Sequence, residues 1–100
     1  MPTPAHITAN TRLAQAGSAI STLIPGEAVI LDPVSGRYFG LDGVGVRVWE
    51  LLSETTTLEA LVRTIVDEYE ADASTCERDL RALLEDLLAR GLVVLADARR

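Results

Sequence analysis

The sequence predicts an α+β domain in which three short strands precede three helices, with a final short strand at 92–95. Two observations support this prediction. Between residues 19 and 41, short β-branched and apolar runs are separated by turn-forming residues, which is typical of an antiparallel meander. From residue 42 to residue 91, apolar residues recur at intervals of three and four, which is typical of helices that bury one face. Strands and helices that are segregated along the chain favour the α+β class.

The three predicted strands cover residues 19–24, 27–31 and 37–41. A Pro-Gly dipeptide separates the first two strands, and the sequence Asp-Pro-Val-Ser-Gly separates the last two. Both sequences favour turns, and the second loop has a usual hairpin length. The third strand is the last one before the chain enters the helices, so we expect it to lie at an edge of the sheet.

The three helices have recognisable start and stop signals. The first is predicted over 42–52, with Asp42 as its N-cap. Capping-box sequences begin the second helix at Thr56 and the third at Ser74, and the third ends at Gly91. Acidic residues crowd the last turn of the second helix, where the helix dipole disfavours them. The local sequence does not explain this crowding unless a basic partner or an arginine side chain approaches that turn.

The chain is expected to divide into a flexible N-terminal arm at 1–18, one domain at 19–95 and a short tail at 96–100. The arm is polar and contains two prolines, as is typical of mobile termini. Residues 6–8 within it could add a short strand. The single histidine, His6, is interpreted as a solvent-exposed residue without a role.

Charge and composition limit the classes of partner. The formal net charge is −6 and all nine basic residues are arginine. Because cationic side chains supply most nucleic-acid affinity, an acidic domain argues against DNA or RNA as a partner. The longest apolar run is far shorter than the roughly 20 residues that span a membrane. No secretory signal is visible at the N-terminus, so we expect a cytoplasmic protein without membrane contact.

No motif for catalysis, metal or cofactor binding emerges. One histidine cannot build a catalytic triad or a histidine metal site. Cys76 has acidic neighbours, whereas a reactive thiolate needs positive surroundings. The glycine-rich residues 40–45 lack the spacing and the following Lys-Ser/Thr of a phosphate loop. We expect a protein that is not an enzyme and binds no cofactor.

The element order also resembles a winged helix-turn-helix, which raises DNA binding as an alternative. Its recognition helix would present Arg78 and Arg81 among several carboxylates, and those carboxylates would repel phosphates. Peptide binding is the class of function that remains. The predicted edge strand at 37–41 can accept an added strand through its unpaired backbone groups. Apolar residues of the last helix could complete a groove beside it.

An ordered set of short sequences resembles the PqqD-like family, and the match covers about residues 19–94. The last helix keeps the pattern Asp-Leu followed by paired leucines, and the chain then continues with Arg-Gly-Leu-Val. The most similar runs are EAVILD at 27–32, SGRYFGLD at 35–42, VWELL at 48–52 and TLEAL at 57–61.

The resemblance implies a recognition element for ribosomally made, post-translationally modified peptides. Such an element binds the leader of a precursor peptide as an extra strand on its third strand, facing its third helix. Stand-alone proteins of this size look most like the leader-binding protein of lasso-peptide biosynthesis. Their expected partners are the precursor leader peptide, a leader peptidase and a macrolactam-forming cyclase. The alternatives are a PqqD-type peptide chaperone for a radical-enzyme pathway, a winged-helix DNA-binding regulator, or a structural subunit that binds the peptidase alone.

Carried onto this sequence, the resemblance implies contacts from the third strand and from the last helix. Asp79 and Asp86 would meet basic leader residues. Periodicity leaves open which leucines of the helix face the groove and which face the core. The implied peptide-binding residues are Arg37, Tyr38, Phe39 and Gly40 on the strand, and Cys76, Asp79, Leu80, Leu83, Asp86 and Leu87 on the helix.

Overall fold

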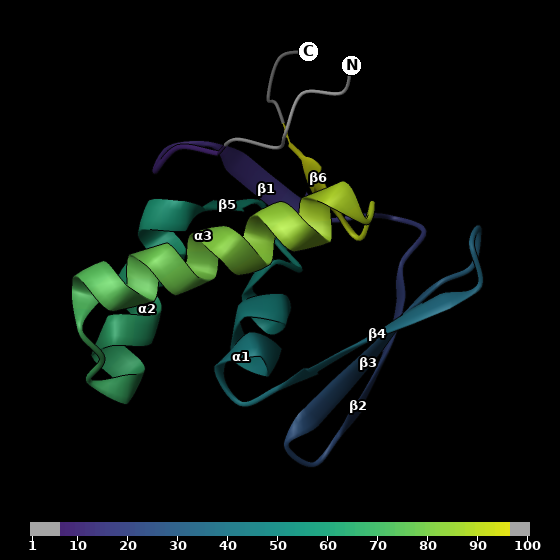
Figure 1. Ribbon diagram of the computed structural model, residues 1–100, viewed down its shortest axis with the longest axis horizontal. Coiled ribbons are helices and arrows are strands. Elements are labelled where there is room, and N and C mark those ends of the chain that lie inside the picture. Colours follow the sequence, from purple (N-terminus) through teal and green to yellow (C-terminus); the bar gives the residue numbers. More distant parts are fainter. Residues whose placement is uncertain (1–6, 97–100) are drawn as a thin grey trace.

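The computed structural model describes residues 7–96 and confirms a mixed α+β fold with three helices and antiparallel sheets (Figure 1). None of the helices within this range is long and apolar enough to cross a membrane. The elements, in chain order, are β1 (Arg12–Gln15), β2 (Ile20–Ile24), β3 (Glu27–Asp32), β4 (Arg37–Asp42), α1 (Val44–Leu51), β5 (Thr56–Thr57), α2 (Leu58–Tyr69), α3 (Ala73–Ala89) and β6 (Val93–Leu95).

The three predicted strands form one antiparallel sheet in the order β2-β3-β4. Residues that face each other across neighbouring strands share a face of the sheet, and faces alternate along each strand. Ala28 lies opposite Leu41, and Ile30 lies opposite Phe39. The first three of these side chains are buried and Phe39 is half-buried, so this face turns inward. Strands β2 and β4 are the two edges of the sheet.

A second sheet, in the order β5-β1-β6, forms from residues far apart in the sequence. Strand β1 pairs antiparallel with both neighbours, and its Leu13 is fully buried. This strand lies inside the segment expected as an arm, where the local pattern does not indicate it. Of the short strand expected at 6–8, Ile7 and Thr8 are not in a strand, and His6 lies outside the described residues.

The N-caps of the helices differ from the predicted ones. Asp42 is the last residue of β4, paired with Glu27, so it does not cap α1, which begins after Gly43. Helix α2 begins one residue later than expected. The Oγ1 of Thr57, the second residue of β5, accepts a hydrogen bond from the backbone N–H of Ala60 at 3.1 Å and caps the helix. At α1 the sheet pairing of Asp42 overrides the local capping pattern, and at α2 the cap shifts to the neighbouring threonine.

Helix α3 begins before the predicted capping box. Oδ2 of Asp72 accepts a hydrogen bond from the backbone N–H of Thr75 at 2.9 Å, which makes Asp72 the N-cap. At the other end, Gly91 takes a left-handed φ of 77°, and Leu92 donates its N–H to the carbonyl of Leu87 at 3.0 Å. This is the Schellman arrangement that glycine favours after a helix. It turns the chain sharply from α3 into β6.

An arginine meets the acidic last turn of α2, as the sequence pattern indicates. Arg47 of α1 donates to both carboxylate oxygens of Glu68, from Nε at 2.9 Å and from a terminal nitrogen at 2.8 Å. The pKa of Glu68 is lowered by this hydrogen bond and by the charge of Arg47. The bidentate pair joins α1 to α2 and offsets the unfavourable position of the carboxylate near the helix end.

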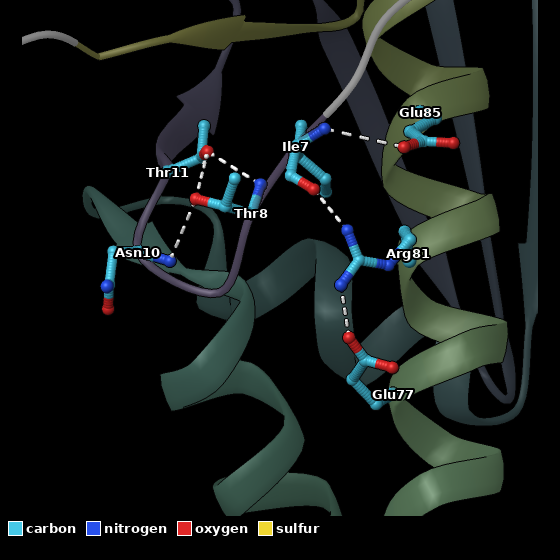
Figure 2. Close-up of polar contacts among 7 residues, drawn as sticks. All are labelled: Ile7, Thr8, Asn10, Thr11, Glu77, Arg81 and Glu85. Atoms are coloured by element: carbon cyan, nitrogen blue, oxygen red, sulfur yellow. Dashed lines mark hydrogen bonds and ion pairs between the residues drawn. The ribbon is translucent and has the colours of Figure 1, made fainter.

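The segment before β1 is held on one face of α3 (Figure 2). The backbone N–H of Ile7 donates to Oε2 of Glu85 at 3.4 Å, and its carbonyl accepts a hydrogen bond from Arg81. Arg81 also pairs with Glu77. The Ile7 side chain is only 2% exposed, so this contact covers part of the core. It occupies the face of α3 that bears Glu77, Arg81 and Glu85.

Candidate functional site

Strand β4 has an unpaired outer edge. It pairs with β3 on one side, and no strand among residues 7–96 pairs with it on the other. Its six residues therefore present backbone N–H and C=O groups that another extended chain can use. The inner face of β4 carries the half-buried Phe39 and the buried Leu41, whereas Tyr38 on the outer face is 70% exposed.

A cleft of about 390 Å³, here called the hairpin cleft, lies between the start of β4 and the end of α3. Phe39 and Arg90 lie together in it: the guanidinium carbon of Arg90 stands 4.7 Å from the centre of the Phe39 ring. Arg90 Nε also donates to Oδ1 of Asp86 at 3.0 Å. The cleft is lined by Asp32, Ser35, Arg37, Tyr38, Phe39, Ala89, Arg90 and Leu92.

A second cleft of about 290 Å³, here called the helical cleft, lies among the starts of α1 and α3 and the end of α2. Its lining is mostly apolar, with the carboxylates of Asp72 and Asp79 as its charged groups. Asp72 accepts hydrogen bonds from Ser74 and Thr75, and these hydrogen bonds lower its pKa. The cleft is lined by Val44, Ile65, Ala71, Asp72, Thr75, Cys76, Asp79 and Leu80.

The two clefts lie at opposite ends of the same two elements. The hairpin cleft takes residues from the start of β4 and the end of α3. The helical cleft takes residues from the start of α3, and also Val44, which follows β4 after one intervening residue. One cleft thus includes the first residues of β4, and the other includes a residue that follows its last one. We call β4 and these two clefts the groove.

The residues implied as peptide contacts divide by burial and by position. Arg37, Tyr38, Gly40, Asp79 and Asp86 are exposed. Phe39 and Leu83 are half-buried, whereas Cys76, Leu80 and Leu87 are 7% exposed or less and belong to the core. The structure brings Arg37, Tyr38 and Phe39 to the hairpin cleft and Cys76, Asp79 and Leu80 to the helical cleft; Gly40, Leu83, Asp86 and Leu87 line neither.

Sequence reasoning missed several lining residues, of which Arg90 is the most informative. Its helix position indicates only an exposed residue near the end of α3. In the folded protein the end of α3 lies beside the start of β4, and this approach places Arg90 over Phe39. No local sequence signal indicates this placement of Arg90. A hairpin residue, Asp32, is also brought to the same cleft.

The cysteine in the helical cleft is not a nucleophile in this setting. Burial raises the pKa of the Cys76 thiol, and the negative charge of Asp79 raises it further. The thiol is therefore held in its protonated, less reactive form. Among residues 7–96, no group of three or more His, Cys, Asp or Glu side chains is placed to hold a metal ion.

The arginines on and directly after α3 each have an acidic neighbour, although the exposed Arg78–Asp79 contact is a weak one. Arg78 lies 3.4 Å from Asp79, Arg81 pairs with Glu77, and Arg90 pairs with Asp86. A recognition helix needs cations that are free to meet phosphates, and its carboxylates must not repel them. Here Arg81 also donates to the Ile7 carbonyl. The electrostatics of α3 therefore oppose contact with a nucleic-acid backbone.

Comparison with known proteins gives one family and several solved structures. The family model described as coenzyme PQQ synthesis protein D (PqqD) matches residues 27–93. The structure of TbiB1 in complex with the TbiA(beta) leader peptide is 39% identical to this chain. It covers 87% of this chain and 99% of TbiB1, with a TM-score of 0.75. No protein in the curated set matches.

Two more distant structures share the fold. Lasso peptide synthetase B1, complexed with the leader peptide, is 22% identical, with 82% of this chain and 96% of that chain covered and a TM-score of 0.72. The PqqD truncation of Methylobacterium extorquens PqqCD, a stand-alone recognition element solved by NMR, is 21% identical. Coverage there is 90% and 96%, with a TM-score of 0.74.

Proposed function

This chain belongs to the PqqD family, and we propose that it is a non-catalytic protein that binds the leader of a ribosomally made precursor peptide. The leader would add as a strand to the free edge of β4, between the two clefts. Strand addition uses main-chain hydrogen bonds for affinity and pockets for alternate side chains for specificity. The free edge of β4, facing a cleft at each end, is the observation that carries the proposal.

The sheet has a second edge at β2, and the surroundings favour β4. All five residues of β2 are exposed, and none of them lines the hairpin cleft or the helical cleft. A strand added there would gain backbone hydrogen bonds without side-chain pockets. A strand added to β4 would also bury apolar surface against Phe39 and the start of α3. Since pockets supply specificity, we place the leader on β4.

We assign the pathway to lasso-peptide biosynthesis. The proposal is supported by the likeness to lasso peptide synthetase B1, solved with the leader peptide, and by the 39% identity to TbiB1, also solved with a leader peptide. In this role the chain would capture the precursor in the cytoplasm, where ribosomes make it, and deliver it to a leader peptidase and a macrolactam-forming cyclase. The contacts would come from Arg37 to Gly40, from Asp79 and from Leu83. Cys76, Leu80 and Leu87 would support the groove from the core side.

A fluorescence-polarisation titration tests the proposal. The probe is the labelled leader of the precursor peptide encoded beside the gene, and the controls are a scrambled leader and a random DNA duplex. We expect saturable binding to the leader alone. Binding to the duplex alone would support the DNA-binding alternative instead. Failure to bind either would contradict the proposal and favour a subunit that binds only partner proteins.

Two variants locate the site. Phe39→Asp places a charge in the hairpin cleft and should abolish binding. Because Phe39 packs against the core, Ala89→Gln provides a second test that leaves the core intact. It adds an exposed side chain to the same cleft without changing charge, and it should weaken binding while the circular dichroism spectrum stays unchanged. Leader affinity that is unaffected by both variants would place the site elsewhere.

A further inference from the structure

We infer that the bound leader segment carries a basic residue towards its N-terminal end and an acidic residue about four positions later, on the same face of the strand. This inference rests on the proposed function and specifies the charge order that the groove selects. Strand β4 itself begins with Arg37 and ends with Asp42. The two clefts also differ in charge: the helical cleft offers a carboxylate to a ligand, whereas the hairpin cleft offers a cation.

The helical cleft is acidic. Asp72 and Asp79 line it, and no basic residue does. Asp72 accepts hydrogen bonds from Ser74 and Thr75 in its own cap, so Asp79 is the carboxylate that a ligand can engage. Asp79 makes one surface contact with Arg78, at 3.4 Å and with the Asp79 side chain 67% exposed. Exposed pairs of this kind are weak, so the carboxylate remains available to a basic ligand side chain.

The hairpin cleft offers a cation. Its single lining acid, Asp32, is engaged in its own turn, where it accepts hydrogen bonds from the Val34 N–H and the Ser35 hydroxyl, both at 3.0 Å. Arg90 is paired with Asp86. Arg37, in contrast, forms no ion pair with any residue between 7 and 96. Asp32 lies directly opposite Arg37 across the β3–β4 pair, but its carboxylate oxygens already accept hydrogen bonds within the turn. Arg37 is therefore the more accessible cation of this cleft for an incoming carboxylate.

The direction of the added strand determines the order in which the basic and acidic residues occur along the leader sequence. Both existing pairings in the sheet are antiparallel. A leader that continues the pattern would begin at the Asp42 end of β4 and finish at the Arg37 end. Arg37 and Leu41 lie at the two ends of β4 on its inner face, so leader residues that lie opposite them on that face are four positions apart. The reverse charge order would set like charges against each other, which is destabilising.

Two labelled peptides of identical composition test the inference. After truncation has found the shortest leader segment that binds, one version receives Lys near its start and Glu four positions later. The other version has these two residues exchanged. We expect the Lys-first peptide to bind about tenfold more tightly, since two charge pairs change from attractive to repulsive. The identical composition removes any contribution from the net charge of −6.

A charge-inverted protein provides the reciprocal test. Arg37→Glu combined with Asp79→Arg keeps the net charge and should bind the Glu-first peptide more tightly than the Lys-first one. The matched control is Glu59→Arg with Arg63→Glu, which exchanges an exposed ion pair on α2 that lines neither cleft, and it should keep the wild-type preference.

The outcomes distinguish a failure of the charge-order inference from a failure of the proposed function. If the wild-type protein binds the unmodified leader but shows no preference for the Lys-first peptide over the Glu-first one, the charge-order inference is wrong and the proposed function stands. The same holds if the charge-inverted protein keeps the wild-type preference. If the wild-type protein does not bind the unmodified leader, the proposed function itself fails.

Discussion

The helical part of the molecule buries many more apolar residues than the β2-β3-β4 sheet does. Helices α1 to α3, with β1, β5 and β6, contain most of the buried apolar residues, including Trp49, Leu52, Leu61 and Leu84. The β2-β3-β4 sheet adds only Ala28, Ile30 and Leu41 to the core. In Figure 1 this sheet extends away from the helices.

The difference separates stability from recognition. A buried side chain contributes by leaving water and by packing, so the helical part supplies most of the folding free energy. A strand that must accept a partner has to keep one edge unpaired, and an uncovered edge adds little to the core. The sheet can therefore be thin because its function lies at the edge of β4. The predictions below test this division.

The largest effect is expected from a cavity in the helical part. Leu84 of α3 is fully buried, and Leu84→Ala should lower the free energy of unfolding by about 2–5 kcal/mol. The matched variant Leu23→Ala, in a strand where that leucine is 53% exposed, should cost less than about 1 kcal/mol. Urea unfolding followed by circular dichroism measures both. Similar losses would show that the sheet carries an equal share of the stability.

The second effect concerns the two edges of the sheet. Phe39→Asp on β4 should weaken leader binding by about 30-fold or more, as expected for an interface anchor. Leu23→Asp on β2 places the same charge on the same face of the sheet, at the opposite edge. It should leave the affinity nearly unchanged in the polarisation assay. Equal losses in the two variants would indicate that the leader does not choose β4.

A smaller effect is expected at Gly40, which lies opposite Val29 on the outer face of the sheet. A Cβ added there would meet nothing within 4 Å, and the backbone does not need glycine. Gly40→Ala should stabilise the protein by about 0.4–1 kcal/mol, because it restricts the unfolded chain. Leader affinity should stay within about twofold. A marked loss of affinity would show that the leader backbone approaches β4 on the outer face.

The smallest effect is a pH dependence in the helical part. The pKa of Asp72 is lowered in the folded protein by the hydrogen bonds from Thr75 and Ser74. Its charged form therefore stabilises the fold above the ordinary carboxyl pKa, and this stabilisation is lost as the pH falls towards the lower folded value. Asp72→Asn should be less stable near pH 7 and match the wild type at low pH. Thermal melts of both proteins across that pH range measure the difference in stability. A difference that does not change with pH would contradict a stabilising role for the Asp72 charge.

Local patterns predicted most of the elements. The strands at 20–24, 27–32 and 37–42 lie within one residue of the expected bounds, because the turn residues between them act locally. The expected edge position of β4 is also confirmed by the strand order. The N-caps were less predictable. Asp42 has the right chemistry for a cap, but it is held in a sheet pairing that local sequence does not reveal. At α2 two adjacent threonines have the same capping chemistry, and the structure uses Thr57 rather than Thr56.

The candidate site was predicted only in part. The contribution of β4 followed from its position in the chain and from the family resemblance. Periodicity could not divide the leucines of α3, because a helix face that is apolar for packing and one that is apolar for binding have the same spacing. The structure assigns Leu80, Leu84 and Leu87 to the core and leaves Leu83 half-buried.

By itself, the sequence determined the fold class, the strand and helix segments and the absence of a recognisable catalytic motif. These depend on residues a few positions apart, whose apolar period and turn propensity act locally. Tertiary structure decided that β1 joins a second sheet, that Arg90 covers Phe39, and that two clefts of different charge lie at the ends of β4. These features join residues distant in the chain, and such contacts are set by how the packed elements meet rather than by any local run of residues.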